Sequence, residues 1–315
     1  MAPASAVVGV DVGGTNVMTA AFDEDHRIGG RRKIATPRDG PEAALAAVVA
    51  VIESLQVEVA AVGIGIPGPV SKGVVYSPPN MIGWTEPVDV VTQIQERLGV
   101  PVVVDNDVTV AVIGEWHAGA AAGASFVLGV WLGTGVGGGL VLDGRPYRGA
   151  VGAAGEFGHT MVRKGGAMCG CGRRGCVEAY AGRACMERMV ATAVEAGERT
   201  ALLEIAEKRG KTRLTSGVWA EALKSGDQVA SRIIAEAVEA VGIGIGSAVN
   251  LLDLDTVVIG GGLAEKLGHD LVDRIRMAAE GQMLAAGGER RFALAELGDD
   301  AGVIGAGALA RTLLG

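Results

Sequence analysis

The sequence has few aromatic residues: four Trp, three Tyr and four Phe among 315 residues. Proline is also sparse, at 10 residues, and the 51 glycines follow no Gly-X-Y period, which excludes a collagen-like fibre. Disorder is excluded as well, because 49% of the residues are hydrophobic. The glycines must therefore lie inside a folded protein, at tight turns or where the backbone closely approaches another group. A chain of this length typically forms two domains.

An excess of basic residues is lacking too, since the formal net charge is −8. Without a basic stripe to neutralise phosphates, nucleic acid is not expected as a partner. The first residues, Met1 to Gly14, lack the basic and apolar regions of a signal peptide. The uncharged run from Ala118 to Leu142 holds eight Gly in 25 residues and breaks at Gly133-Thr134-Gly135. We therefore expect two buried strands there rather than a membrane helix, and a cytoplasmic protein.

Strands alternate with helices along the chain, which predicts an α/β fold whose strands are largely parallel. A shift of 120 positions sets Gly9-Val-Asp-Val-Gly13 beside Gly129-Val-Trp-Leu-Gly133. In both places a strand enters a turn of small residues and a second apolar strand leaves. The repeat predicts two lobes of the same topology, each offering one glycine turn to a shared cleft. The alternative is a chance similarity between two Gly-rich hairpins. The expected helices cover Pro41–Gln56, Glu86–Leu98, Ala179–Ala196, Gln228–Leu252 and Gly302–Leu313.

Three glycine turns follow apolar strands: Gly13-Gly14-Thr15, Gly133-Thr134-Gly135 and Gly260-Gly261-Gly262. Such turns suit a polyanion, because Gly lets backbone N–H groups approach phosphate oxygens and Thr adds a hydroxyl donor. Each turn alone is equally an ordinary hairpin. None belongs to a G-x-x-x-x-G-K-[ST] motif. Asp11, just before the first turn, is placed to hold Mg²⁺ through water, or else stabilises the turn.

The run Asp105-Asn106-Asp107 lies where a strand ends and a helix begins. Ligands of α/β proteins bind outside the carboxyl ends of strands, so this position suits a catalytic carboxylate. The alternative is a helix cap. If the reaction is phosphoryl transfer to an alcohol, a carboxylate must receive the hydroxyl proton.

The chain has only four cysteines, and they crowd between positions 169 and 185. His159, Cys169, Cys171 and Cys176 form a His-x9-Cys-x-Cys-x4-Cys pattern, which predicts a closed site for structural zinc. A disulfide or unconnected core cysteines are the less favoured interpretations. A zinc knuckle that binds RNA is disfavoured, because little basic or aromatic material lies nearby.

Two carboxylates flank this cluster, Glu156 in Gly-Glu-Phe-Gly-His159 and Glu178 in Gly-Cys-Val-Glu178. A Glu on a loop is usually solvated. Two carboxylates fixed by one metal-ordered loop would instead accept hydrogen bonds from a polyhydroxylated ligand, and such a site discriminates strongly between hydroxyl patterns.

Over nearly its whole length, the chain resembles the ROK family (repressor, open reading frame, kinase), specifically its bacterial glucokinase branch. The cysteine motif with its upstream Glu-x-x-His is the most specific feature. The residues that carry the resemblance are Asp11-Val-Gly-Gly-Thr15, Pro67-Gly-Pro69, Asn106-Asp107, Leu132-Gly-Thr-Gly-Val-Gly-Gly-Gly139, Gly155-Glu-Phe-Gly-His159, Cys169-Gly-Cys-Gly-Arg-Arg-Gly-Cys-Val-Glu178 and Gly260-Gly-Gly262.

The resemblance implies a two-lobed actin/hexokinase-like (ribonuclease H-like) α/β fold that closes over ATP and a hexose. A small lobe would cover residues 1–118, completed by a helix at about 300–315, and a large lobe with the zinc loop would cover 119–299. Asp107 would deprotonate the 6-hydroxyl of the sugar. Other sugar contacts would come from Gly68, Asn80, Asn106, Glu156, His159 and Glu178. The phosphates would be lined by Asp11, Gly13, Gly14, Thr15, Thr134 and Gly135, and the adenosine by Gly261 and Gly262.

The expected activity is that of an ATP-dependent glucokinase with Mg²⁺ and structural Zn²⁺, working as a homodimer or homotetramer. The alternatives are a kinase for mannose, allose or an N-acetylhexosamine, and a kinase that uses polyphosphate. A sugar-responsive repressor is disfavoured, because only ten residues precede Asp11 and Asp107 is retained. Two positions depart from the usual pattern of the family: Asn16 stands where many relatives have Lys, and Val108-Thr109 where others have Ala-Asn.

Overall fold

The computed structural model describes residues 5–23, 28–76, 78, 81–284 and 288–315. The chain divides into two compact units. Unit 1 comprises Met1–Gly123, Gly139–Gly155 and Asp299–Gly315, and unit 2 comprises Ala124–Gly138 and Glu156–Gly298.

Unit 1 is built on a five-stranded sheet in the order β3-β2-β1-β4-β8. The first three strands are joined by hairpins and pair antiparallel, whereas β4 and β8 run parallel to β1. The expectation of largely parallel strands thus holds for two of the four pairings in this sheet, and the pairings β1–β2 and β2–β3 are antiparallel. The sheet strands are β1 (Ala6–Val12), β2 (Asn16–Phe22), β3 (Ile28–Ala35), β4 (Val59–Ile66) and β8 (Val102–Asn106), and the helices are α1 (Pro41–Glu53), α2 (Val90–Leu98), α3 (Asp107–Ala118) and α10 (Ala301–Arg311). A small sheet joins β5 (Val70–Ser71), β6 (Val74–Val75) and β7 (Val88–Asp89).

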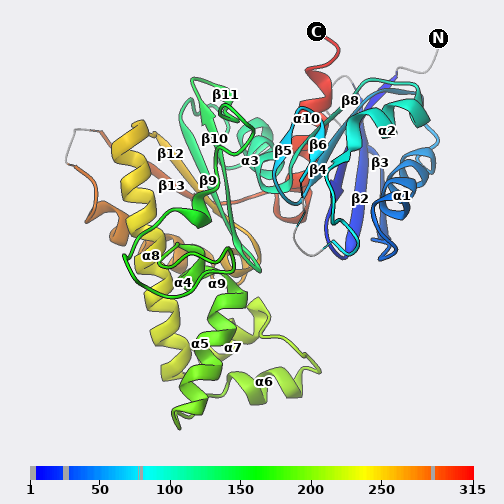
Figure 1. Cartoon of the computed structure of the whole chain (residues 1–315). Coiled ribbons are helices and arrows are strands. Elements are labelled where there is room, and N and C mark those ends of the chain that lie inside the picture. The colour runs from blue at the N-terminus through cyan, green and yellow to red at the C-terminus, as the bar shows by residue number, and fades with distance from the viewer. Residues whose placement is uncertain (1–4, 24–27, 77, 79–80, 285–287) are drawn as a thin grey trace. The chain divides into compact units, whose positions relative to one another are not determined.

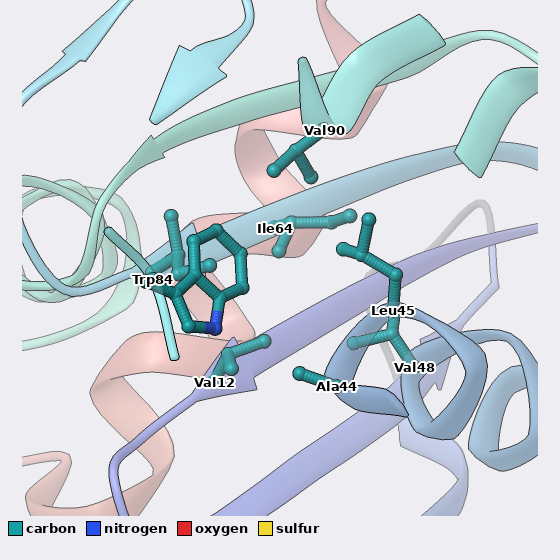
Figure 2. Close-up of a pocket in the computed structure, with 8 residues that line it drawn as sticks. Val12, Ala44, Leu45, Val48, Ile64, Trp84 and Val90 are labelled. Atoms are coloured by element: carbon teal, nitrogen blue, oxygen red, sulfur yellow. The ribbon is translucent and has the colours of Figure 1, made fainter. Parts of the chain in front are cut away.

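One face of this sheet packs against α1 and α2. Because side chains alternate along a strand, Val8 and Val10 of β1 belong to this core together with Leu45 of α1. Figure 2 shows part of this core, where Trp84 lies beside Ile64 and near Leu45 of α1. The space left between these apolar side chains is too small for a water molecule. Close packing on this side holds the strand ends in a fixed frame.

The other face of the sheet packs against α10, which lies against β1, β4 and α3 (Figure 1). Two glycines allow the backbones to touch: a Cβ on Gly9 would lie 2.0 Å from the carbonyl oxygen of Val303, and one on Gly63 would lie 1.9 Å from that of Ala306. No larger residue fits at either position. The expected final helix thus forms and completes the core of the first sheet, although it ends at Arg311, two residues before its expected end.

The second sheet has the order β11-β10-β9-β12-β13, which repeats the order of the first sheet strand for strand. Its strands are β9 (Val127–Leu132), β10 (Val136–Leu142), β11 (Arg145–Pro146), β12 (Thr256–Gly260) and β13 (Arg291–Leu294). The division between the units falls within β10. Two findings follow. The uncharged run at 118–142 forms two strands, as expected, and the repeat at a spacing of 120 positions corresponds to the shared topology.

In unit 2, a long segment between β11 and β12 adds the metal-ligand loop and most of the helices. These are a 3-10 turn η1 (Phe157–His159), α4 (Glu178–Ala181), α5 (Arg183–Glu195), α6 (Leu202–Lys208), α7 (Ser216–Lys224) and α8 (Gln228–Leu252), followed after β12 by α9 (Gly262–Glu280) and a second 3-10 turn η2 (Gly298–Asp300), which straddles the boundary with unit 1.

The helix α8 is long and apolar enough to cross a membrane by length and composition alone, but most of that stretch is buried inside the protein. Its interior glycines allow close packing, as expected. A Cβ on Gly242 would lie 2.5 Å from that of Ala278 in α9, and one on Gly244 would lie 2.8 Å from the ring of Phe157. These features are typical of a core helix.

Three further expected helices differ from the structure. The helix expected over Pro41–Gln56 ends at Glu53. The helix expected from Glu86 begins only at Val90, because the side chain of Asp89 caps it by accepting from the N–H of Thr92 at 3.0 Å. The helix expected over Ala179–Ala196 is broken at Gly182, which has an extended conformation and separates α4 from α5.

Candidate functional site

The first glycine turn joins β1 to β2 in unit 1. The N–H of Gly13 donates to the carbonyl oxygen of Asn16 at 2.8 Å and closes the turn. The hydroxyl of Thr36 donates to the carbonyl of Gly13 at 2.6 Å, and the N–H of Thr36 donates to that of Thr15 at 2.9 Å. Gly14 is half-buried and Thr15 is exposed. Backbone and hydroxyl groups make all of these contacts, so the turn owes its shape to its own strands.

Asp11 lies in β1, two residues before this turn, and is half-buried. Its carboxyl group contacts the first turn of α10, since a Cβ on Gly302 would lie 2.6 Å from the Asp11 Cγ. The pKa of Asp11 is raised to about 7, chiefly by burial and then by the nearby carboxylates of Asp107 and Asp299, while Lys33 opposes the shift. Three acidic groups therefore interact at this corner of unit 1. A bound cation would favour their ionised forms.

The end of β8 and the start of α3 place Asn106 and Asp107 side by side. The Asn106 side chain caps α3: its Oδ1 accepts from the N–H of Val108 at 3.0 Å and of Thr109 at 3.1 Å. Its Nδ2 donates to the carbonyl of Gly68 at 3.1 Å. The helix cap that the sequence suggested for an aspartate at this position is therefore provided by Asn106. Asp107 follows as the first residue of the helix, half-buried, with its Oδ1 accepting from the Val108 N–H at 2.9 Å.

An ion pair between buried Asp105 and half-buried Arg148 supports this end of the strand. Asp105 is only 5% exposed, and its Oδ2 accepts from the Nε of Arg148 at 2.5 Å. The other oxygen of Asp105 accepts from the N–H of Asn106 at 2.9 Å. The sequence around Asp105 does not indicate its pairing with Arg148, which lies 43 positions later. The pair fixes the backbone that carries Asn106 and Asp107.

Gly68 has a positive φ of 93°, and a Cβ there would lie 2.8 Å from the Cα of Pro78. Its carbonyl therefore points to Asn106 with no room for a side chain. Asn80, the other expected sugar contact of this region, lies outside the described residues.

The second glycine turn, between β9 and β10 in unit 2, is held at one end by Glu178. The turn closes with the N–H of Gly133 donating to the carbonyl of Gly135 at 3.0 Å. The Oε2 of Glu178 accepts from the N–H of Val136 at 3.0 Å. A Cβ on Gly135 would lie 2.4 Å from this oxygen, so only glycine leaves room for the carboxylate.

At its other end, the same turn is held by Arg183, the first residue of α5. The backbone N–H of Arg183 donates to the carbonyl of Gly133 at 3.2 Å, and that of Ala184 donates to the carbonyl of Thr134 at 3.0 Å. The guanidinium adds two bonds, from Nε to the Gly133 carbonyl at 3.1 Å and from Nη2 to the Thr134 hydroxyl at 3.3 Å. The sequence alone did not indicate a role for Arg183, because its contact with Gly133 spans 50 positions.

The third glycine turn connects β12 to α9. Gly261 caps α9 with a positive φ of 85°, and a Cβ there would lie 2.8 Å from the backbone N of Leu132. Leu132 is the last residue of β9 and directly precedes the second turn. Gly262, the first residue of α9, lies close to the hydroxyl of Ser216. The structure therefore brings the second and third glycine turns together at one edge of the second sheet.

The predicted metal ligands His159, Cys169, Cys171 and Cys176 also come together in unit 2. Their ligand atoms all lie within 4.8 Å of one another. The Cys169 Sγ lies 3.7 Å from the Nδ1 of His159, and the Cys171 Sγ lies 3.8 Å from that of Cys176. No cysteine among the described residues is in a disulfide. Zinc bound to thiolates at about 2.3 Å in a tetrahedron has ligand–ligand edges of about 3.8 Å. The cluster therefore fits a four-coordinate zinc ion.

The two flanking carboxylates differ in their surroundings. Glu156 is exposed and precedes η1, with its carbonyl accepting from the N–H of His159 at 3.0 Å. Glu178 is half-buried, and its Oε1 lies 3.4 Å from the Cys169 Sγ while Oε2 binds the second turn. Glu178 thus contacts both the metal-ligand loop and the glycine turn, a position that spacing along the chain did not indicate.

The comparisons with known proteins cover nearly the whole chain. The model of the ROK family matches residues 7–313. A glucokinase of Streptomyces coelicolor is 35% identical over 96% of this chain and 97% of its own. Among solved structures, a ROK hexokinase from Thermus thermophilus is 31% identical with a TM-score of 0.83, covering 98% of this chain and 99% of that one. A ROK family glucokinase from Streptomyces griseus, solved in complex with glucose and AMPPNP, is 33% identical with a TM-score of 0.82, covering 98% and 100%. The expected two-lobed actin/hexokinase-like α/β fold is confirmed.

Proposed function

Because the chain belongs to the ROK family, we propose that it is an ATP-dependent glucokinase, which transfers the γ-phosphoryl group of ATP to the 6-hydroxyl of glucose. The observation that carries the proposal is the full-length likeness to glucokinases, including one solved with glucose and AMPPNP. The retained Asn106-Asp107 pair at the end of β8 supplies the matching chemistry. The chain is a sugar kinase.

Asp107 acts as the general base. Phosphoryl transfer leaves the protein little covalent chemistry, so catalysis rests on positioning and on charge stabilisation. Asp107 accepts the proton of the sugar hydroxyl as that oxygen attacks the phosphorus. Asn106 fixes the start of α3 and the Gly68 carbonyl, and the Asp105–Arg148 pair fixes the strand behind them. These contacts hold the base in place before the substrate arrives.

The remaining sugar contacts are Gly68, Asn80, Asn106, Glu156, His159 and Glu178. The two glycine turns, Gly13 to Thr15 and Gly133 to Gly135, bind phosphates, and Gly261 and Gly262 line the adenosine. Asp11 would hold Mg²⁺ through water, and the cation would neutralise charge on the phosphates. It would also favour the ionised form of Asp11, whose pKa is raised to about 7 without it.

A structural zinc ion bound by His159, Cys169, Cys171 and Cys176 organises the loop that carries Glu156 and Glu178. Four protein ligands leave zinc no open position, so it takes no part in the chemistry. We further propose that the protein works in the cytoplasm as a homodimer or homotetramer, on small molecules, without nucleic acid or a membrane.

A coupled assay across a panel of hexoses tests the function. We expect phosphorylation of glucose with ATP to exceed that of mannose, allose and N-acetylmannosamine, and inorganic polyphosphate to be a poor donor. Faster turnover of another hexose would reassign the substrate, and faster turnover with polyphosphate would reassign the donor. Absence of turnover for every sugar with both donors would overturn the proposal.

A further inference from the structure

We propose that Arg183 binds the phosphate chain of the nucleoside triphosphate and orients the Thr134 hydroxyl toward it; the inference deepens the proposed function and rests on it. The proposal starts from the position of the Arg183 side chain. Arg183 places a cationic side chain directly on the glycine turn of unit 2, through Nε to the Gly133 carbonyl and Nη2 to the Thr134 hydroxyl. Because the hydroxyl of Thr134 is fixed from one side, its free rotation is restricted.

The charge of Arg183 is not neutralised by a direct partner. Among the described residues, no carboxylate lies within ion-pair distance of its guanidinium. Glu187, the acidic group that acts on it most strongly, is itself bound to the Arg213 Nε at 2.7 Å and to the Leu214 N–H at 2.9 Å. Burial lowers the pKa of Arg183, which means that its charged form is partly desolvated. A half-buried cation without a paired carboxylate is available to bind an approaching phosphate.

The guanidinium of Arg183 has N–H groups that are not used by the turn and can bind a ligand. An arginine side chain carries five N–H groups in a planar fork. Two of the five serve the turn, so three remain for an incoming acceptor. A planar fork matches the spacing of two phosphate oxygens, which is why arginine recognises phosphates bidentately. The chemical class of the ligand is therefore a phosphate chain, presented beside the backbone N–H groups of the turn.

Among the described residues, no cationic side chain is hydrogen-bonded to the first glycine turn. Asn16 follows that turn, and the contacts that close it come from backbone groups and the Thr36 hydroxyl. The cationic side chain that binds the phosphate chain therefore comes from α5 of unit 2.

Calorimetric titration with AMPPNP, ADP and adenosine tests the inference in the absence of sugar. Arg183→Gln should weaken AMPPNP binding about ten- to hundredfold, ADP binding less, and adenosine binding not at all, since adenosine carries no phosphate. Arg183→Lys keeps the charge but loses the fork, so its affinity for AMPPNP should lie between the two. Arg232→Gln is the matched control, because Arg232 pairs with exposed Glu198 away from the turns.

The outcomes separate this inference from the proposed function. Equal AMPPNP affinity of Arg183→Gln and the wild type would overturn the role of Arg183, even if glucose is phosphorylated. An equal loss for AMPPNP and adenosine would also overturn it, because the effect would then not depend on phosphate. If no hexose is phosphorylated but AMPPNP binding still depends on Arg183, the inference stands and the function falls. If Arg183→Gln does not fold, AMPPNP affinity is measured with Arg183→Lys instead. An affinity equal to that of the wild type would then overturn phosphate binding by the planar guanidinium of Arg183.

Discussion

The two sheets have the same strand order, yet the corresponding positions carry different chemistry. Asp11 in β1 corresponds to Trp131 in β9, at the same distance before the glycine turn. Asp11 is a carboxyl group with a raised pKa, whereas Trp131 packs against Gly260, where a Cβ would lie 2.6 Å from the indole ring. One copy of the topology keeps a polar group at the turn, and the other fills the same position with packing.

The two turns also differ in what holds them. Strand neighbours hold Gly13 to Thr15, while the charged side chains of Glu178 and Arg183 hold Gly133 to Gly135. Both charged residues come from the long segment inserted between β11 and β12. The repeated topology therefore supplies two similar turns, and inserted residues make them different. On the proposed function, unit 1 provides the base Asp107, and unit 2 provides Arg183, which binds the phosphate chain of the donor.

The largest effect should come from removing the base in unit 1. Asp107→Asn should lower kcat about 10²- to 10⁴-fold, because the amide cannot accept the hydroxyl proton, and should leave glucose affinity nearly unchanged. The assay is coupled kinetics, with calorimetry for binding. Asp89→Asn is the control, since Asp89 caps α2 and Asn caps a helix equally well. Turnover near that of the wild type in Asp107→Asn would contradict the assignment.

Next in size is loss of the metal from unit 2. The purified protein should hold about one zinc ion per chain, and Cys171→Ser should lose it and melt at a lower temperature, because structural zinc contributes directly to folding. Metal analysis and calorimetry measure both. Cys185→Ala is the control, because Cys185 is buried in α5 outside the cluster and should keep the zinc. Well-folded wild-type protein free of zinc would refute the site.

A smaller effect should distinguish the two turns directly. Gly135→Ala forces a methyl group against the Glu178 carboxylate and should cost about 1–3 kcal/mol of stability while raising the KM for ATP. Gly133→Ala, whose Cβ would lie 3.8 Å from its nearest neighbour, is the control within the same turn. Gly13→Ala, at 3.3 Å from the Asn16 carbonyl, is the control in unit 1. If all three variants behave alike, the turns do not differ as described.

The smallest effect is a pH dependence of stability that belongs to unit 1. The pKa of Asp11 is about 7 in the folded protein, against an unperturbed value of 3.8. Above pH 7 the folded state carries a poorly solvated charge; as the pH falls from about 7 toward 4, the folded state binds a proton that the unfolded state does not, so stability rises.

Asp11→Asn removes this gain. In magnesium-free buffer the variant should melt a few degrees above the wild type at pH 8, and the difference should shrink or reverse by pH 5. Exposed Asp39→Asn should show no such trend. Parallel melting curves for wild type and Asp11→Asn across this range would contradict the raised pKa.

Local patterns in the sequence were sufficient to predict most strands, the glycine turns and the clustering of His159 with three cysteines. The four ligands are close in the chain, and alternation marks buried strands, so both signals are local. The mixed direction of the first sheet could not be read from the same alternation, because hairpins and crossovers both separate apolar runs.

The residues that support the site lie far apart in the sequence. Arg148 pairs with Asp105 across 43 positions, and Arg183 reaches Gly133 across 50. Each has a plain sequence context, and only the folded backbone brings it to its partner. Asn106 shows a subtler case: it takes the capping role considered for its neighbour, which is decided by side-chain direction rather than by residue type.

The packing of α10 has a consequence for the order in which the protein forms during its synthesis. Val303 and Ala306 fill the face of β1 and β4 that Gly9 and Gly63 leave open. A ribosome makes these helix residues only after all of unit 2. Domains usually fold in the order of synthesis, but here the unit that begins first must wait, with an apolar sheet face uncovered, until unit 2 has been made. The nascent chain therefore finishes unit 1 last.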